Sequence, residues 1–419
     1  MEKTNYTISF SPSADAVDVD LPASKSISNR ALTIAAMTDG CSIGSIGNIA
    51  DCDDTNAMRR ALLTQSAQAN VNIGAAGTAM RFLTAYFASQ PWRSVLLDGT
   101  PRMRKRPIGE LVEALRLCGA EIDYYASEGY PPLWIEGRHL KADAPLRMRG
   151  NVSSQYVSAM MMVAPMMKGG LTIEIEGGLT SRPYVEMTAA LMRHFGAEVT
   201  VGESTIVIEG KPYSPSSLTV ESDWSAASYW YEIKALCPDL DIRLNGLQSD
   251  SLQGDSRVAE YFKLFGVTTE YTDNGVALGF CDADRDATLN IDLSSQPDIA
   301  QTIVVTACLT GRPFRIGGLH TLRIKETDRL EALRAQLAQL GFNIEIADDS
   351  ILSWDGAAGE AAAHPRILTY DDHRMAMAFA PAAIRFPSLT VLDAGVVSKS
   401  YPDYWRHLAL AGFKMEVAK

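Results

Sequence analysis

Positively charged side chains gather at a few points of a chain that is acidic overall. The 419 residues include 38 Lys and Arg and 50 Asp and Glu, a formal net charge of −12. Most of the cation-rich segments stand at or just before the expected start of a helix, where free N–H groups and the helix dipole already attract anions. A cation at a helix start is repelled by the positive end of the dipole, which costs stability. Binding of an anionic ligand would explain why the chain keeps cations at these places. The segments are SKSISNR from Ser24, RMRKRP from Arg102, RIKETDR from Arg323 and DDHRMA from Asp371, with Lys399 as a fifth candidate.

Each cluster also has an ordinary structural interpretation. RMRKRP could be a solvated turn before a proline-started helix. Lys325 and Glu326 lie four and three residues before Arg329, which is the spacing of a surface ion-pair set on a helix. Arg374 is harder to explain in this way, because the rest of its helix is Met, Ala and Phe. A buried arginine without an anion is costly.

Polar residues open the buried helices of the chain and are candidates for the same chemistry. Ser153 or Ser154, Asp223, Asp298 and Asp372 all have the side chains of good N-caps. For any one of them, the residue type alone favours capping as the sole role.

Other polar positions near the cations have two interpretations each. Serines stand at positions 24, 26 and 28 around Lys25, and capping cannot use all three hydroxyls. GAAGTAMR, from Gly74, resembles an anion-cradling loop, although a tight turn that packs a helix has the same composition. Gln155 and Tyr184 could be core polar groups that are satisfied locally.

A repeated unit positions these residues. Five segments end an expected helix with an apolar residue, a glycine and the start of a strand, and the glycines recur every 70–77 residues, at positions 119, 196, 266, 341 and 412. Glycine suits the residue after a helix because it reaches the left-handed conformation without a Cβ clash. A second series of mostly apolar helices recurs at nearly the same period, near Thr78, Ser154, Trp224, Ile299 and His373.

These two series predict the order strand, buried helix, strand, amphipathic helix and two strands. An earlier buried helix, 28–37, precedes the next by a shorter interval, so the first unit is expected to be truncated after Asp54. Six units are too many for one core, which predicts two lobes of about three units. The Pro- and Ser-rich stretch 211–223 is the expected crossing between them.

Composition excludes several classes of function. The N-terminus lacks a secretory signal, and the densest apolar run, 159–167, is too short to span a bilayer. The six cysteines are scattered without a CxxC pair, which predicts reduced core residues of a cytoplasmic protein. No His/Cys cluster has metal-ligand spacing. The negative net charge argues against nucleic acid as a general partner.

Ten segments of the sequence resemble, in order, the motifs of the 5-enolpyruvylshikimate-3-phosphate synthase family. They are LPASKSISNRAL, GAAGTAMR, LDGTPRMRKRPI, GNVSSQY, TSRPY, SDWSAAS, PDIAQT, RIKETDRL, DDHRMAMAF and KSYPDYW, and the resemblance covers essentially the whole chain. The resemblance implies an α/β fold of two lobes, each of three βαβαββ units, the inside-out α/β barrel of the enolpyruvyl transferases. Residues 21–221 would form the N-terminal lobe and residues 1–20 and 222–419 the C-terminal lobe, with the active site in the cleft between them.

The resemblance also implies a reaction and its substrates. The family transfers the enolpyruvyl group of phosphoenolpyruvate to the 5-hydroxyl of shikimate 3-phosphate and releases phosphate, in the biosynthesis of aromatic amino acids. It needs no metal and no organic cofactor, and glyphosate inhibits it at the phosphoenolpyruvate site. The expected partners are therefore small anionic substrates, without nucleic acid or membrane, for a cytoplasmic monomer.

Carried over motif by motif, the resemblance implies roles for individual residues. Asp298 would face the 5-hydroxyl, and Glu326 and Lys25 would carry protons at the enolpyruvyl carbon, with His373 nearby. Shikimate 3-phosphate would be held by Ser26, Arg30, Ser153, Ser154, Gln155, Tyr184 and Lys325. Phosphoenolpyruvate would be held by Lys25, Gly77, Arg106, Gln155, Arg329, Arg374 and Lys399.

The sequence departs from the family pattern in three places. The first unit is short and lacks most of the outer helix–strand pair after Asp54. Ala75 and Phe82 stand where the family usually has Asn and Pro, which affects the shape of the phosphoenolpyruvate pocket. Thr321 stands where Asn is common, so one phosphate contact of shikimate 3-phosphate could differ.

Two other functions are compatible with the same fold. The sister enzyme transfers enolpyruvyl to UDP-N-acetylglucosamine, but it has a reactive cysteine where this chain has RMRKRP, and Asn where this chain has Ser26. A non-catalytic anion-binding scaffold is the second alternative. The intact set of Lys25, Asp298, Glu326 and Arg374 argues against it.

Overall fold

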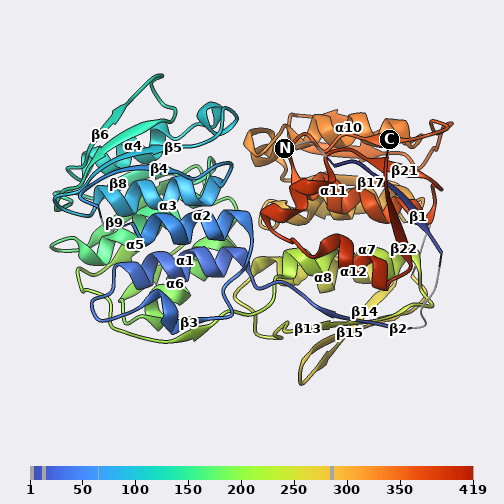
Figure 1. The fold of residues 1–419 in the computed structure, drawn as a ribbon, viewed down its shortest axis with the longest axis horizontal. Coiled ribbons are helices and arrows are strands. Elements are labelled where there is room, and N and C mark those ends of the chain that lie inside the picture. The colour runs from blue at the N-terminus through green and yellow to red at the C-terminus, as the bar shows by residue number, and fades with distance from the viewer. Residues whose placement is uncertain (1–3, 12–15, 65, 284–286, 419) are drawn as a thin grey trace. The chain divides into compact units, whose positions relative to one another are not determined.

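The computed structural model describes residues 4–11, 16–64, 66–283 and 287–418, and its chain divides into two compact units (Figure 1). Residues 23–220 form one, here called the N-terminal unit. Residues 1–22 and 221–419 form the other, the C-terminal unit. The chain therefore passes between the units after Pro22 and after Val220, the second time within the Pro- and Ser-rich stretch.

The N-terminal unit contains two complete repeats and one partial repeat. Its buried helices are α1 (Lys25–Ala36), α3 (Gly77–Ala88) and α5 (Ser154–Val163), and its outer helices are α2 (Asp53–Leu62), α4 (Gly109–Leu117) and α6 (Arg182–His194). One sheet has the order β4 (Gln68–Asn72), β5 (Ser94–Asp98), β7 (Leu133–Glu136), β6 (Glu121–Tyr124). The other has the order β10 (Val199–Val201), β11 (Thr205–Ile208), β9 (Leu171–Glu176), β8 (Leu146–Arg149).

The C-terminal unit contains three complete repeats. Its buried helices are α7 (Trp224–Leu236), α9 (Ala300–Leu309) and α11 (His373–Phe379), and its outer helices are α8 (Val258–Tyr261), α10 (Arg329–Gln339) and α12 (Tyr404–Leu410). Its first sheet contains β2 (Ala16–Asp20), β13 (Asp241–Asn245), β14 (Val267–Thr272) and β15 (Gly275–Phe280). Its second sheet contains β16 (Leu289–Asp292), β17 (Phe314–Gly317), β18 (Glu345–Ala347) and β19 (Ile351–Trp354). The third contains β20 (Arg366–Ile367), β21 (Leu389–Val391), β22 (Phe413–Val417) and β1 (Tyr6–Phe10).

Every four-stranded sheet in the described residues has the same internal order. The first two strands of the repeat are parallel neighbours, as β4 and β5 or β16 and β17 are. The last two strands pair antiparallel and lie beside the second strand, as in the order β16-β17-β19-β18. The predicted βαβαββ repeat and the α/β class are therefore confirmed.

The start of the chain completes two sheets of the C-terminal unit. β1 pairs antiparallel with β21 and β22, and β2 pairs parallel with β13. In Figure 1 these strands are the blue segments that lie among red and yellow-green ones. Because β1 fills the place of the last strand in the last repeat, the first 20 residues belong to the C-terminal unit and not to the unit that follows them in sequence.

The first unit is shortened, as predicted, but the prediction that it lacks most of the outer helix after Asp54 is wrong. The outer helix α2 is present and begins at Asp53. The hairpin is what the repeat lacks, because the strand that follows α2 is β4, which pairs in parallel with β5 of the next repeat. The strand between α1 and α2 is β3 (Ile46–Gly47), and its parallel partner β12 (Leu218–Thr219) comes from the end of the unit. The helix was missed because it ends at Leu63 in a right-handed conformation, without the glycine that marks the other outer helices.

Left-handed glycines end the outer helices as predicted. Gly119, Gly196 and Gly341 have φ angles of 88°, 81° and 85°. After α4, the amide of Ala120 donates to the carbonyl of Leu115 at 3.0 Å, and the amide of Gly119 donates to the carbonyl of Arg116 at 2.9 Å, which is the Schellman pattern. Gly266 also has a left-handed φ but follows a 3₁₀ segment, Phe262–Phe265, because α8 is a single turn.

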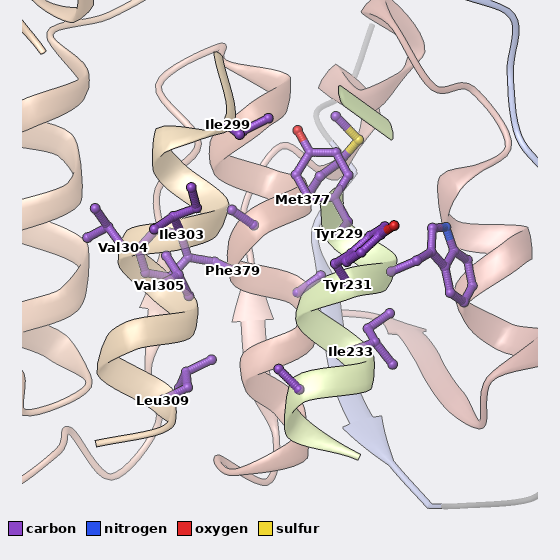
Figure 2. Packing of buried hydrophobic residues seen from close by; sticks show 14 of the residues in the cluster. Tyr229, Tyr231, Ile233, Ile299, Ile303, Val304, Val305, Leu309, Met377 and Phe379 are labelled. Carbon is purple, nitrogen blue, oxygen red and sulfur yellow. The ribbon is translucent and has the colours of Figure 1, made fainter. Parts of the chain in front are cut away.

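Close packing in the core fixes where the N-termini of the buried helices lie. All ten residues of α9 are buried, and side chains of α7, α9 and α11 belong to one hydrophobic core of the C-terminal unit, from which Figure 2 labels Tyr231, Ile303 and Phe379 among others. Close packing on every side holds a helix in register. No helix in the described part of the chain is long and apolar enough to cross a membrane.

The cysteines fit the prediction of core residues only in part. All six are free. Cys52, Cys118 and Cys308 are buried, whereas Cys41 and Cys237 are half-buried and Cys281 is exposed. The scattered spacing correctly predicted that the cysteines do not form disulfides, but it did not predict which of them are buried.

Candidate active site

Asp298 lies among three cations in the C-terminal unit. One carboxylate oxygen, Oδ2, lies 3.0 Å from Nη2 of Arg374, and the other, Oδ1, lies 3.3 Å from Nη1 of Arg329 and 3.5 Å from Nζ of Lys325. Burial opposes ionisation of this carboxyl, but the charges of Arg374, Lys325 and Arg329 outweigh it and hold the pKa of Asp298 well below its usual value. The carboxylate is therefore ionised in this structure.

Capping is not the role of Asp298, contrary to what its residue type favours. It lies inside a 3₁₀ turn, Pro297–Ile299, and the N-cap of α9 is Ile299. The turn places Asp298 one residue before the N-cap of α9. Its carboxylate contacts the neighbouring cations instead of capping the helix. Asp372, Asp223 and Ser153 do cap their helices, by accepting from the amides of Arg374, Ser225 and Gln155 respectively.

Glu326 is held between two cations. Its Oε1 lies 2.8 Å from Nζ of Lys399, and its Oε2 lies 3.0 Å from Nη2 of Arg329. The side chain is 14% exposed. It lies just before α10, so the helix start of one repeat and the 3₁₀ segment Ala394–Lys399 of the next meet at this carboxylate.

Arg329 and Asp372 form the buried base of the network. Nε of Arg329 donates to Oδ2 of Asp372 at 2.7 Å, and Asp372 is fully buried. Burial lowers the pKa of Arg329, but the negative charges of Asp372, Glu326 and Asp298 more than reverse this effect. The cost of a buried arginine at a helix start is thus offset by carboxylates of the chain itself, and not only by the external anion that we inferred from the sequence.

A second layer, which the sequence did not reveal, lies behind Arg374. Nη2 of Arg374 lies 3.5 Å from Oγ of Ser225, and that hydroxyl donates to a carboxylate oxygen of Asp255. Burial, followed by repulsion from Asp298, raises the pKa of Asp255 to about 7. Asp255 lies in the turn Gly254–Arg257, where its sequence neighbours QG and SR gave no sign of a buried acid.

In the N-terminal unit, Lys25 is the first residue of α1. Its Nζ lies 3.1 Å from Oδ2 of Asp54, in the first turn of α2. Of the serines around it, Ser24 caps α1 and Ser28 accepts from the amide of Ala50, whereas Ser26 is half-buried. Sequence analysis missed Asp54 because it did not expect α2 to form.

Gly77 and Arg106 come together at the start of α3. A Cβ atom on Gly77 would lie 2.9 Å from Cζ of Arg106, so a side chain at position 77 would require the end of the Arg106 side chain to move. Arg106 is 8% exposed, whereas Arg104 is exposed and its Nε lies 2.9 Å from Oδ1 of Asp98. The solvated-turn interpretation of RMRKRP therefore holds for its other cations, Arg102 and Lys105 included, but not for Arg106.

Four further predicted residues lie at the starts of α5 and α6 in the N-terminal unit. Ser153 and Ser154 open α5, and Nε2 of Gln155 donates to Oγ1 of Thr78 in α3 at 3.2 Å. Tyr184 is half-buried in α6, with its ring centroid 5.7 Å from Cζ of Arg30.

The two units differ in how the predicted residues are grouped. In the C-terminal unit Asp298, Lys325, Glu326, Arg329, Arg374 and Lys399 form one contacting network. In the N-terminal unit the contacts join smaller sets: Lys25 with Asp54, Arg30 with Tyr184, Gly77 with Arg106, and Gln155 with Thr78. His373 is almost fully buried beside Asp372, with Nδ1 3.6 Å from Oδ1. No group of three His, Cys, Asp or Glu in the described residues could hold a metal ion.

Comparison with solved structures defines the class of protein. Two structures of an EPSP synthase from Acinetobacter baumannii superpose with a TM-score of 0.76. They are 22% and 21% identical in sequence, and each comparison covers 99% of this chain and 100% of the other. At this identity the likeness establishes a shared fold, the two-unit α/β architecture described above.

Sequence comparison establishes the family. The family model of EPSP synthase (3-phosphoshikimate 1-carboxyvinyltransferase) matches residues 59–408. A 3-phosphoshikimate 1-carboxyvinyltransferase of Bacteroides fragilis (strain YCH46) is 50% identical over 412 residues, which cover 97% of this chain and 98% of the relative. One of Bordetella petrii is 38% identical over 419 residues, covering 92% of each. The chain belongs to the EPSP synthase family.

Proposed function

We infer that this chain carries out the reaction of its family, in which the enolpyruvyl group of phosphoenolpyruvate is transferred to the 5-hydroxyl of shikimate 3-phosphate with release of phosphate. The reaction belongs to the shikimate pathway of aromatic amino acid biosynthesis. The observation that carries the inference is the full-length match to relatives of this name, at 50% identity over 97% of the chain. The network around Asp298 and Glu326 supplies the charges that the reaction needs.

Both substrates carry a phosphate, and phosphoenolpyruvate also carries a carboxylate, which explains the number of cations. Guanidinium groups match the oxygens of both anions with two parallel hydrogen bonds. We propose that Lys25, Gly77, Arg106, Gln155, Arg329, Arg374 and Lys399 bind phosphoenolpyruvate. Ser26, Arg30, Ser153, Ser154, Gln155, Tyr184 and Lys325 would bind shikimate 3-phosphate, so that residues of both units act on the same pair of substrates.

The chemistry is an addition followed by an elimination. The 5-hydroxyl oxygen bonds to C2 of phosphoenolpyruvate while C3 gains a proton, which gives a tetrahedral intermediate. The bond from C2 to the phosphate oxygen then breaks, and C3 loses a proton to restore the double bond. Each step needs a placed acid or base.

We propose that Asp298 takes the proton of the 5-hydroxyl and that Glu326 and Lys25 move the proton at C3. Surrounded by three cations, Asp298 is a weak base in this structure. Anionic substrates that bind to those cations would compensate their charge and raise the basicity of Asp298 and Glu326. The carboxylates would thus become effective bases only when the substrates are present.

The proposal is tested by substrate-dependent release of phosphate from the purified full-length chain. We expect release from phosphoenolpyruvate only when shikimate 3-phosphate is added, without added metal or organic cofactor. Release that depends on UDP-N-acetylglucosamine would instead identify the sister activity, and binding of both substrates without turnover would identify a scaffold. We further propose that the chain is a cytoplasmic monomer, which sedimentation of the purified protein would check.

A further inference from the structure

Arg30 is a buried cation whose recorded partners are all neutral. Its side chain lies in α1 and is 2% exposed. Nε donates to Oγ1 of Thr188 at 2.7 Å, Nη2 to Oγ of Ser158 at 3.4 Å and Nη1 to the carbonyl of Ser26 at 3.0 Å. Burial lowers the pKa of Arg30 to about 10, which the Tyr184 phenol only partly opposes. Arg329, equally buried, is instead paired with carboxylates.

Two aromatic rings complete the surroundings of the Arg30 guanidinium. Its Cζ lies 5.2 Å from the ring centroid of Phe82 in α3 and 5.7 Å from that of Tyr184 in α6. Phe82 is fully buried, so its ring is fixed. A cation near an aromatic face gains about 0.5–2 kcal/mol, and the larger value applies to desolvated pairs. Phe82 is the residue that stands where the family pattern has proline, which has no ring of this kind to offer.

The two hydroxyls that accept from Arg30 are themselves held in place. Oγ1 of Thr188 lies 2.9 Å from Oγ of Ser158 and 2.7 Å from the carbonyl oxygen of Tyr184. Thr188 and Ser158 are fully buried and come from α6 and α5. Side chains from three helices, α3, α5 and α6, therefore fix one guanidinium of α1.

We propose that Thr188, Ser158 and Phe82 are positioning residues for shikimate 3-phosphate, because they orient Arg30 without neutralising it. This inference rests on the proposed role of Arg30 in binding that substrate. A guanidinium has five N–H groups, and three are used inside the protein. The other two, one on each terminal nitrogen, remain for an anionic ligand. A fixed cation with neutral neighbours loses little entropy on binding and keeps its full charge for the ligand.

A purely structural role explains this arrangement poorly. A buried charge costs more than an apolar side chain of similar size, and replacing buried ionic groups by apolar ones is often stabilising. The helices α1, α3, α5 and α6 would pack around a leucine or methionine at this place without three accompanying polar groups. The arrangement is explained if an anion binds there.

The test compares two replacements of Thr188. Thr188→Val keeps the shape and removes the hydroxyl, whereas Thr188→Ser keeps the hydroxyl. A hydrogen bond to a charged group contributes about 1.5–3 kcal/mol, so we expect Thr188→Val to weaken shikimate 3-phosphate binding by roughly tenfold or more. Thr188→Ser should restore affinity to about that of the wild type. Phe82→Leu should weaken it by a smaller factor, roughly threefold to tenfold.

The measurements are the Kd of shikimate 3-phosphate by calorimetry, both KM values, kcat and the melting temperature. The matched control is Thr84→Val, which removes another fully buried hydroxyl of the same unit that bonds back to a helix carbonyl, that of Met80 at 2.7 Å. We expect the control to lower stability to a similar extent without changing Kd. Thr188→Val should change Kd and the KM for shikimate 3-phosphate, with kcat and the KM for phosphoenolpyruvate changed less than about twofold.

Three results would overturn the proposal. One is a folded Thr188→Val variant that binds shikimate 3-phosphate as tightly as the wild type. Another is an equal loss of affinity for both substrates. The third is a loss that Thr188→Ser fails to restore. Arg30→Met separates this failure from a failure of the proposed function, because it should abolish tight binding of shikimate 3-phosphate even if Thr188 proves irrelevant. If Arg30→Met also binds normally, the role of Arg30 is wrong, while wild-type turnover still decides the reaction.

Discussion

Individual carboxylates of the C-terminal unit serve as counterions for the cations that we propose bind the substrates. Asp298 contacts three cations, Glu326 contacts two, and the buried Asp372 anchors Arg329. An arginine cluster without these acids would repel itself and would be expensive to bury. In the proposed mechanism the same acids become available for proton transfer when substrates compensate the cations, so one set of residues would serve both the empty and the occupied site.

Replacing Glu326 separates proton transfer from charge balance. Glu326→Gln keeps the shape and the contacts with Arg329 and Lys399 but cannot carry a proton. If Glu326 is an acid–base group, we expect kcat to fall by about 10²–10⁴ with little change in substrate affinity. The control is Glu331→Gln in the first turn of α10, where the acid is half-exposed and pairs with the surface Arg334, and kcat should not change.

Steady-state kinetics with both substrates measures this effect. Arg374→Ala is the second comparison, because the loss of an anion contact should raise the KM for phosphoenolpyruvate more than it lowers kcat. A Glu326→Gln enzyme with near-normal kcat would limit Glu326 to charge balance and leave Lys25 as the preferred proton carrier.

Gly77 tests the phosphoenolpyruvate side of the proposal. The methyl group of Gly77→Ala would meet the Arg106 guanidinium, 2.9 Å from Cζ, and only the flexible end of the arginine could move away. We expect the KM for phosphoenolpyruvate to rise by roughly tenfold, because Arg106 is displaced, while that for shikimate 3-phosphate stays the same. Competition by glyphosate, which acts at this site in the family, should weaken more. Equal changes for both substrates would show that Gly77 does not line the phosphoenolpyruvate site.

At the scale of elements, the left-handed glycines should differ in how much they contribute to stability. A Cβ on Gly119 would meet nothing within 4 Å, so Gly119→Ala costs only the left-handed strain, about 1–2 kcal/mol. A Cβ on Gly341 would lie 2.6 Å from the backbone carbonyl oxygen of Gly359. We expect Gly341→Ala to cost clearly more, because backbone must move.

Urea unfolding of the two variants against the wild type measures the difference. Gly119→Asn is the control, since asparagine tolerates the left-handed region better than alanine and should lose less stability. Equal losses at positions 119 and 341 would mean that the close approach to Gly359 does not decide the cost.

At the scale of the whole molecule, a buried acid should make stability depend on pH. Glu232 lies in α7, is fully buried, and neither carboxylate oxygen has a hydrogen-bond partner in the structure. Burial raises the pKa of Glu232 well above its usual value, so the folded protein keeps a proton on this side chain at a pH where the unfolded chain has lost it. In the unfolded chain the proton is released at the ordinary glutamate pKa of about 4.3. Its stabilising contribution is complete below that pH and is lost as pH rises through the folded-state pKa.

Glu232→Gln should remove this dependence, because glutamine stays neutral. We expect the melting temperatures of the variant and the wild type to be similar near pH 5 and to separate by several degrees toward pH 8, with the variant higher. The control Glu270→Gln changes an exposed acid on β14 and should leave the pH profile unchanged. A constant difference across the pH range would show that Glu232 does not hold a proton in the folded state.

The sequence by itself determined the repeat, the class of fold and the family. Helix periodicity, left-handed glycines and N-caps are local properties, because each depends on residues within a few positions of one another. The φ angles of Gly119, Gly196 and Gly341 follow directly from that local signal. The local signal did not predict α2, because this helix ends without a glycine and its repeat lacks a hairpin.

Only the tertiary structure decided which charges meet. Asp298 and Arg374 are 76 residues apart, Arg329 and Asp372 are 43 apart, and Arg30 and Thr188 are 158 apart. No local pattern encodes such pairs, because they form where different helices are brought together by packing. For the same reason the basic run RMRKRP did not reveal that Arg106 alone is buried, and the turn around Asp255 gave no sign of its place behind Arg374. The charge and the motif are properties of the sequence, whereas the pKa and the partner of each group depend on the distances that the fold creates.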